Sequence, residues 1–131
     1  MTNQMCPFCS LLPDRLIECN DLAVQIRDGF PISPGHTLII PKRHVSSFFD
    51  LTADEHQAML SLLQSAKEDL DKEFNPDSYN IGINDGPQAG QTVPHVHMHL
   101  IPRYTGDVQD PRGGVRWLIP GKAKYWSDKA G

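Results

Sequence analysis

Three histidines on alternate positions constrain this chain more than any other feature of its sequence. His95, His97 and His99 lie between a glycine-led turn and the Ile-Pro-Arg that follows. Side chains alternate between the two faces of a β-strand, so the three imidazoles would share one face. The other face would be apolar, formed by Pro94, Val96, Met98 and Leu100. The pattern therefore predicts a strand over residues 93–101, with one face in a hydrophobic core and an imidazole face turned toward something else.

Two simpler explanations of the histidine row are less favourable. Single histidines are common on half-exposed strands, but three in register opposite an uninterrupted apolar face are not expected by chance. One metal ion held by all three is also disfavoured, because Cα atoms four residues apart in a strand lie about 13 Å apart. Two neighbouring histidines could share an ion, whereas all three converge poorly.

The chemistry of imidazole favours catalysis at phosphorus. With a pKa of about 6.5 the ring is largely neutral at cellular pH, so one nitrogen is a nucleophile while a hydrogen bond to the other fixes the tautomer. Such a group both attacks and leaves readily, which suits covalent catalysis. Gly90, Gln91 and Thr92 lie directly upstream and offer backbone N–H groups that could neutralise phosphate oxygens. Taken alone, this Gly-Gln-Thr segment is more often an ordinary turn.

The remaining elements predict an α+β domain. Short strand-like runs cover residues 15–18, 22–26, 37–40 and 79–84. Between the third and fourth runs, Thr52 and Glu55 form a capping box, and apolar residues keep helical spacing as far as Phe74. That helix would be about 33 Å long. The order of elements predicts one antiparallel sheet of about five strands, packed with one long helix and a short one.

Length and charge set broader limits. The 131 residues suit a single domain, which we place at residues 1–103. The tail at residues 104–131 carries Trp117, Tyr125 and Trp126, so it should pack on the domain or on a partner subunit. The formal charge is −4 without a basic stripe, so no nucleic-acid partner is expected. No apolar run approaches a membrane span and no secretory signal is visible, so we expect no membrane partner and a cytoplasmic protein.

A Cys-x-x-Cys pair, Cys6 and Cys9, is open to three interpretations. Thioredoxin-type redox chemistry would place the pair between a strand and a helix, whereas this pair lies near the start of the chain. Two free thiols are the second interpretation. The third is a tetrahedral zinc site, which needs two further ligands, and the sequence offers His44 and His95. Cys19 has no partner in the sequence and should be a small buried side chain.

Two longer segments carry a resemblance to a known family. NDGPQAGQTVPHVHMHLIPR is similar to the signature of the histidine-triad (HIT) superfamily of nucleotide-binding proteins, His-x-His-x-His-x-x with x apolar. SPGHTLIIPKRHV resembles the second hallmark of that family. The resemblance extends over residues 6–103 and is strongest to bacterial members and to the Fhit-like hydrolases of dinucleoside polyphosphates. It implies the HIT-like fold and a homodimer whose interface uses the long helix and a neighbouring strand.

The resemblance assigns catalytic roles to three histidines. His97 matches the nucleophile, which would form a nucleotidyl-histidine intermediate that water or another acceptor resolves. His99 would contact the phosphate and the leaving group, and His36 would buttress the triad. Some bacterial members also resemble this chain in having two N-terminal cysteines, which implies a closed, structural zinc site without an open position. The ligands of that site would be Cys6, Cys9, His44 and His95.

The resemblance also outlines a purine-nucleotide site. Polar residues that match ribose and phosphate contacts of the family are Asp28, Asn84, Gly90, Gln91 and Thr92. Apolar residues implied for the base are Leu16, Ile26 and Phe8. The implied activity is hydrolysis or nucleotidyl transfer at the α-phosphate of a dinucleoside polyphosphate or a nucleoside phosphoramidate. The alternatives are a nucleotide-binding adaptor without relevant catalysis and a dinucleoside polyphosphate phosphorylase.

Overall fold

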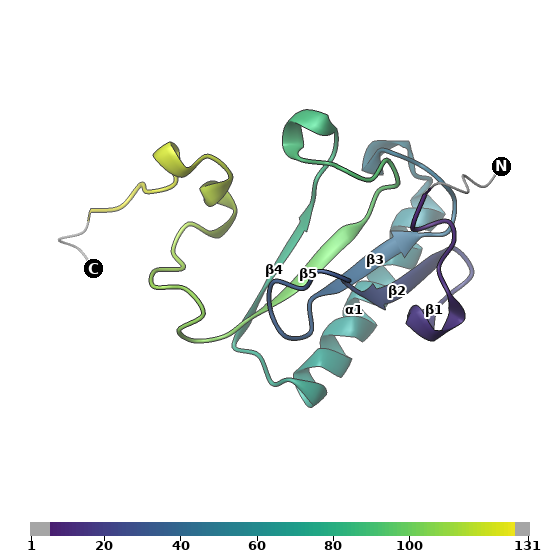
Figure 1. Cartoon of the computed structure of the whole chain (residues 1–131), viewed down its shortest axis with the longest axis horizontal. Coiled ribbons are helices and arrows are strands. Elements are labelled where there is room, and N and C mark those ends of the chain that lie inside the picture. Colours follow the sequence, from purple (N-terminus) through teal and green to yellow (C-terminus); the bar gives the residue numbers. More distant parts are fainter. Residues whose placement is uncertain (1–5, 128–131) are drawn as a thin grey trace.

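The computed structural model describes residues 6–127, which form one antiparallel sheet backed by a long helix (Figure 1). The strands are β1 (Leu16–Cys19), β2 (Ala23–Arg27), β3 (Thr37–Pro41), β4 (Ser78–Ile83) and β5 (Met98–Arg103), and the helix is α1 (Ala53–Glu73). The strand order is β1-β2-β3-β5-β4, so β5 lies between β3 and β4. The α+β class is confirmed, and short 3-10 turns such as Pro87–Ala89 take the place of the expected short helix.

Helix α1 begins and ends where its sequence signals predict. The Thr52 hydroxyl accepts a hydrogen bond from Glu55 N–H at 3.1 Å, and the Glu55 carboxylate accepts one from Thr52 N–H at 2.8 Å. This capping box pairs two N–H groups that a helix start otherwise leaves without partners. No helix within residues 6–127 is both long enough and apolar enough to cross a membrane.

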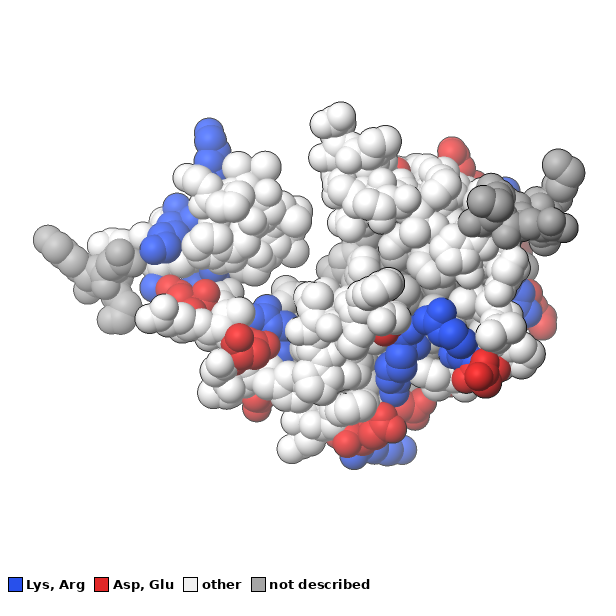
Figure 2. Space-filling view, viewed as in Figure 1, with Lys and Arg blue, Asp and Glu red and all other residues white. Residues whose placement is uncertain are grey.

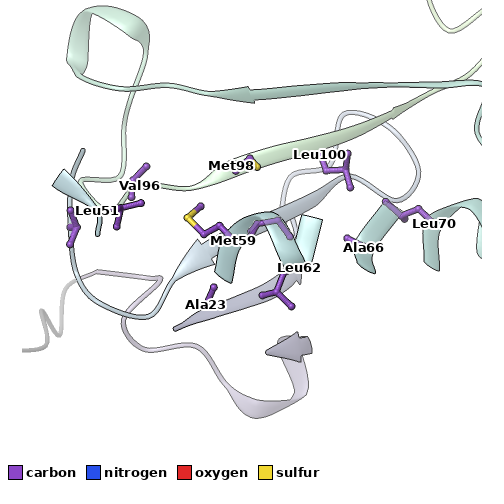
Figure 3. Packing of buried hydrophobic residues seen from close by; sticks show 11 residues of the cluster. Ala23, Leu51, Met59, Leu62, Ala66, Leu70, Val96, Met98 and Leu100 are labelled. Atoms are coloured by element: carbon purple, nitrogen blue, oxygen red, sulfur yellow. The ribbon is translucent and has the colours of Figure 1, made fainter. Parts of the chain in front are cut away.

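The core lies between α1 and one face of the sheet (Figure 3). The helix contributes the buried side chains of Met59, Leu62, Ala66 and Leu70. The histidine segment contributes its apolar face, formed by Val96, Met98 and Leu100. Replacing one such buried Leu or Met by Ala costs about 2–5 kcal/mol, so this packing holds the histidine segment firmly against the helix.

The predicted histidine strand is shorter than its sequence pattern suggests. Ladder pairing of β5 with β3 and β4 begins at Met98, not at residue 93. Before that point Val96 N–H donates to Val45 O at 2.7 Å, and Pro94 has no N–H to donate to a ladder. The prediction of an unbroken strand over residues 93–101 is therefore wrong. The alternation of faces nevertheless persists, because Val96 and Met98 are buried in the core while His97 lies on the other side.

Among the described residues, the opposite face of the sheet is covered near β2 and β3. There Val24, Ile26, Leu38 and Ile40 form a smaller buried cluster that Phe8 and Leu11 cover. Cys19 lies on the edge strand β1 and is exposed, so the expectation that it is buried is wrong. All four residues of β1 are exposed, so neither face of this edge strand is covered by the described residues. The rest of this face is open above β5 and β4, where the cavity described below lies.

The tail leaves the sheet through an anchored turn and then folds on itself. The Tyr104 hydroxyl donates to Pro34 O at 2.7 Å, and Thr105 N–H donates to the Asp77 carboxylate at 2.7 Å. Tyr125 is 74% exposed in the single chain, so this aromatic is not packed on the domain. Packing of the tail on a partner subunit stays a prediction, as does the division of the chain at residue 103.

Candidate active site and adjoining metal cluster

The imidazoles of His97 and His99 line a cavity of about 1230 Å³. Strand β5 forms its floor, and His99 is paired there with Leu38 of β3 on one side and Gly82 of β4 on the other. One wall comes from the loop between β2 and β3, and the opposite wall comes from β4 and the tail. Figure 2 shows the cleft between the tail and the main body at the surface.

His97 has one fixed nitrogen and one available nitrogen. Its Nδ1 lies 3.0 Å from the carbonyl oxygen of His95, which can only accept, so Nδ1 carries the proton. The neutral ring then has its lone pair on Nε2. Because His97 lines the cavity, this tautomer provides a nucleophile there without any prior proton transfer.

A chain of hydrogen bonds fixes the other two imidazoles. Ile32 N–H donates to His36 Nδ1 at 3.2 Å, so the proton of neutral His36 is on Nε2. That Nε2 lies 2.9 Å from His99 Nδ1 and donates to it. The proton of His99 is consequently on its own Nε2. The hydrogen bond from His36 thus determines which tautomer His99 adopts.

Burial keeps this pair of imidazoles neutral. Desolvation lowers the pKa of His36, although the nearby Asp28 carboxylate, 3.4 Å away, acts in the opposite direction. Desolvation likewise lowers the pKa of His99 to about 4, assisted by His97 and His36. At neutral pH His99 is therefore a hydrogen-bond donor and not an imidazolium acid. Asp28 lines the cavity beside both rings and also accepts a hydrogen bond from Phe30 N–H at 2.8 Å.

The loop before the histidines is held in shape by Gln91. Its carbonyl oxygen accepts from Gly86 N–H at 2.8 Å, and its amide donates to Ser46 O at 2.8 Å and to Val93 O at 3.1 Å. Gly90, Thr92 and Asn84 line the cavity, whereas Gln91 does not. Sequence reasoning placed Gln91 at the phosphates, but its side chain is occupied in bracing the loop that carries its neighbours.

The structure changes the set of apolar residues near Asp28. Ile26 is fully buried in the cluster beneath Phe8, and Leu16 lies on the edge strand β1; neither lines the cavity. Phe8 and Leu38 do line it, together with Phe30 and Ile32 from the Asp-Gly-Phe-Pro-Ile loop. Phe30 is 90% exposed and Ile32 74% exposed. Two large apolar side chains inside a polar turn were the available sequence signal, and it was missed.

A second cluster lies beside the cavity, where Cys6, Cys9, His44 and His95 converge. His95 Nδ1 lies 3.4 Å from Cys6 Sγ, 3.5 Å from Cys9 Sγ and 3.3 Å from His44 Nδ1. For tetrahedral zinc the expected separations are about 3.6 Å between sulfur and nitrogen ligands and about 3.3 Å between two nitrogens. The three separations from His95 Nδ1 are close to these values, and Cys9 Sγ lies 3.2 Å from His44 Nδ1. All four predicted ligand atoms lie within 4.8 Å of one another, so the structure brings them together.

The protonation of this cluster also fits a metal. His95 Nε2 lies 2.7 Å from the carbonyl oxygen of Pro41, so its proton is on Nε2 and its Nδ1 lone pair faces the other three ligands. Burial lowers the pKa of His95, which keeps the ring neutral, as a ligand must be. Burial raises the pKa of the Cys6 thiol.

The cluster and the cavity share structural parts. The backbone carbonyl that orients His97 belongs to His95, one of the four cluster residues. Phe8 lies between the two cysteines in sequence, and its ring packs edge-on against the His97 ring, with 5.0 Å between the ring centroids. The loop that holds His44 is tied to α1 by Arg43, whose guanidinium makes two hydrogen bonds to Glu55, at 2.7 and 3.0 Å. His56, at the start of α1, lies apart from the cavity with its Nε2 2.8 Å from Phe48 O.

Comparison with known proteins gives matches in both sequence and structure. The model of the HIT domain family matches residues 11–106. In Arabidopsis thaliana, the bifunctional bis(5'-adenosyl)-triphosphatase/adenylylsulfatase FHIT is 47% identical over 79 residues, which are 60% of this chain and 44% of that protein. The asymmetrical bis(5'-nucleosyl)-tetraphosphatase of Schizosaccharomyces pombe is 45% identical over 80 residues, 61% of this chain and 44% of that protein. The chain therefore spans less than half of each of these relatives.

Solved structures give a fuller overlap. The crystal structure of a protein from Bacillus anthracis, described as a HIT family protein, superimposes with a TM-score of 0.73 at 34% identity. The match covers 79% of this chain and 77% of that one. The five-stranded sheet and long helix thus have a counterpart over most of both chains.

Proposed function

The chain belongs to the HIT domain family, and from that premise we propose that it is a nucleotide hydrolase or transferase that acts at the α-phosphate of a purine nucleotide. The names of its relatives favour a dinucleoside polyphosphate as substrate. We propose nucleoside phosphoramidates as a second class. The observation that carries the proposal is the lone pair of His97 Nε2 in a cavity, fixed there by the hydrogen bond of Nδ1 to His95 O.

In the proposed first step, His97 Nε2 attacks the α-phosphorus. A P–N bond forms while the bond from phosphorus to the bridging oxygen breaks, and the leaving nucleotide takes both electrons of that bond. A terminal phosphate with a second pKa of about 6 leaves as an anion at neutral pH and needs no proton. The His95 carbonyl, which accepts from Nδ1, stabilises the positive charge that develops on the ring.

In the second step, water attacks the phosphorus of the nucleotidyl-histidine. The P–N bond breaks, its electrons return to Nε2, and the proton lost by the water passes to solvent, which releases the nucleoside monophosphate. The neutral His99 donates its Nε2–H to a phosphate oxygen during both steps, and backbone groups near Gly90 and Thr92 serve the other oxygens. Asp28 accepts the ribose hydroxyls, and Asn84 lies at the phosphates.

We assign the Cys6, Cys9, His44 and His95 cluster to a structural Zn²⁺ ion. The spacing of the ligand atoms and the His95 tautomer support zinc. A bound zinc ion would contribute a cross-link between the N-terminal segment, the loop after β3 and the histidine segment. Thiolate ligands suit a reducing compartment, which supports the cytoplasm as the location.

We also propose a homodimer through α1 and β4. Strand β4 is an edge of the sheet, so one side of its backbone has no ladder partner within the described residues. An open strand edge is a surface that a second copy would pair with. Light scattering after size exclusion should give twice the chain mass, 29 kDa from 14.7 kDa per chain.

Turnover of two substrates tests the proposal against its alternatives. Diadenosine triphosphate and adenosine 5'-phosphoramidate should both yield AMP with the wild type and with His56→Ala, which is the matched control. In His97→Ala, kcat should fall by about 10³-fold or more, because the nucleophile is lost. Binding without turnover by the wild type would favour an adaptor. A second run with added inorganic phosphate separates hydrolysis from phosphorolysis, in which ADP would replace AMP.

A further inference from the structure

The cavity continues on the side of the histidines that is away from Asp28. His99 lies on β5 with β3 on one side and β4 on the other, and its neighbour on β4 is Gly82. A Cβ placed on Gly82 would have no described atom within 4 Å, so the cavity floor beside His99 is open at this position. A substrate whose first ribose is at Asp28 therefore has its leaving group over β4.

The tail forms a folded wall for this second part of the cavity. The indole N–H of Trp117 donates to Arg112 O at 2.7 Å, which fixes the orientation of the ring. The guanidinium of Arg116 donates to Ala123 O at 2.9 Å, and Ala123 is fully buried. A Cβ placed on Gly114 would lie 3.4 Å from the Asn80 amide, so the turn is close to β4.

The lining of this part is apolar and aromatic although it faces solvent. Val115, Trp117 and Leu118 line the cavity, with 61%, 39% and 73% of their surfaces exposed. Ile81 faces them from β4. An oriented indole flanked by aliphatic side chains is a stacking surface for a purine ring. The same surface offers nothing to a leaving group as small as ammonia.

The size of the cavity agrees with two nucleosides. Pockets for one small ligand usually measure about 300–1,000 Å³, and this cavity has about 1230 Å³. We infer that the part between β4 and the turn Gly114–Leu118 binds the second, leaving nucleoside of a dinucleoside polyphosphate, with its base against Trp117. This inference rests on the proposed function and specifies its substrate as one with a nucleoside at each end.

Two substrates with the same adenylyl group and different leaving groups test the inference. Trp117→Ala should lower kcat/KM for diadenosine triphosphate about 10- to 100-fold, mainly through KM, because the stacking of one base is lost. It should leave kcat/KM for adenosine 5'-phosphoramidate within about twofold. Trp117→Phe should recover most of the loss. The matched control is Tyr125→Ala, a tail aromatic that does not line the cavity.

The outcomes separate this inference from the proposed function. If the wild type hydrolyses neither substrate, the proposed function fails and the inference with it. If it hydrolyses both and Trp117→Ala affects them equally or not at all, only the inference is overturned. A change of oligomeric state in Trp117→Ala, measured by light scattering, would instead assign this wall to a second copy of the chain and would likewise overturn it.

Discussion

Loss of Arg43 should destabilise the protein by leaving a buried carboxylate without its partner. Glu55 has a side chain only 5% exposed, and Arg43 binds it through two hydrogen bonds. These bonds are the largest cause that lowers the pKa of Glu55 from 4.5 to about 2, and hydrogen bonds with Thr52 contribute a smaller part. At about 1.4 kcal/mol per pKa unit, that shift corresponds to at most about 3.4 kcal/mol. Because the Arg43 side chain is 53% exposed, solvent screening reduces the expected loss in Arg43→Met to about 2 kcal/mol.

The pH dependence distinguishes this electrostatic cause from lost packing. The pKa of Glu55 is depressed in the folded state, so the stabilisation is fully present above pH 4.5 and is lost as pH falls toward 2. The difference in unfolding free energy between wild type and Arg43→Met should therefore be about 2 kcal/mol at pH 7 and should shrink below pH 4.5. Urea unfolding at a series of pH values measures it directly.

Two further variants complete this test. Lys67→Met removes an exposed pair with Asp71 on the same helix and should cost less than about 0.5 kcal/mol. In a Glu55→Gln background, Arg43→Met should cost less than in the wild type, because no buried charge is then left unpaired. An equal cost in both backgrounds, or a cost that does not change between pH 7 and pH 3, would refute the reasoning.

Three other changes have definite expected results. Cys9→Ser should reduce zinc from one ion per chain to well below half, measured by elemental mass spectrometry, and should lower Tm; unchanged zinc content would remove Cys9 from the site. The pKa of His99 is lowered to about 4 in the folded state, so the unfolded state takes up a proton at a higher pH than the folded state does. The free energy of unfolding should therefore fall by about 1.4 kcal/mol per pH unit for this group between pH 6.5 and pH 4. The same urea titration of His99→Asn should give a shallower slope. Gln91→Ala removes three hydrogen bonds from the loop beside His97, so kcat should fall about 10-fold or more, while Tm changes by no more than a few degrees. An unchanged kcat would show that the loop holds its shape without these hydrogen bonds.

Local signals predicted helix α1 well because they act within a few residues. The capping box at Thr52 and the spacing of apolar side chains are sufficient to place Ala53–Glu73. The start of β5 was misplaced because Val96 pairs with Val45, 51 residues away, and no local pattern encodes that partner. Alternation of faces was nevertheless correct, since it depends only on extended backbone.

In the candidate site as well, local patterns did not predict the features that depend on residues distant in the sequence. Convergence of His36 on His99 depends on the fold, and only the family resemblance anticipated it. Convergence of Cys6 on His95 was one of three interpretations of the Cys-x-x-Cys pair, and the family resemblance favoured it. Ile26 was misplaced because a strand pattern gives two faces without saying which one meets the ligand, and its face is covered by Phe8. The turn that carries Trp117 has no periodic pattern, so its place at the cavity could not be foreseen.

The most direct test of the account is the identity of the covalent intermediate. Wild-type protein should be mixed with excess diadenosine triphosphate, quenched at alkaline pH within the first turnover, and examined by intact-mass spectrometry and peptide mapping. The account predicts one AMP attached to His97 and none in His97→Ala, which should also lose turnover. Turnover without an adduct, an adduct on another residue, or undiminished activity in His97→Ala would contradict it.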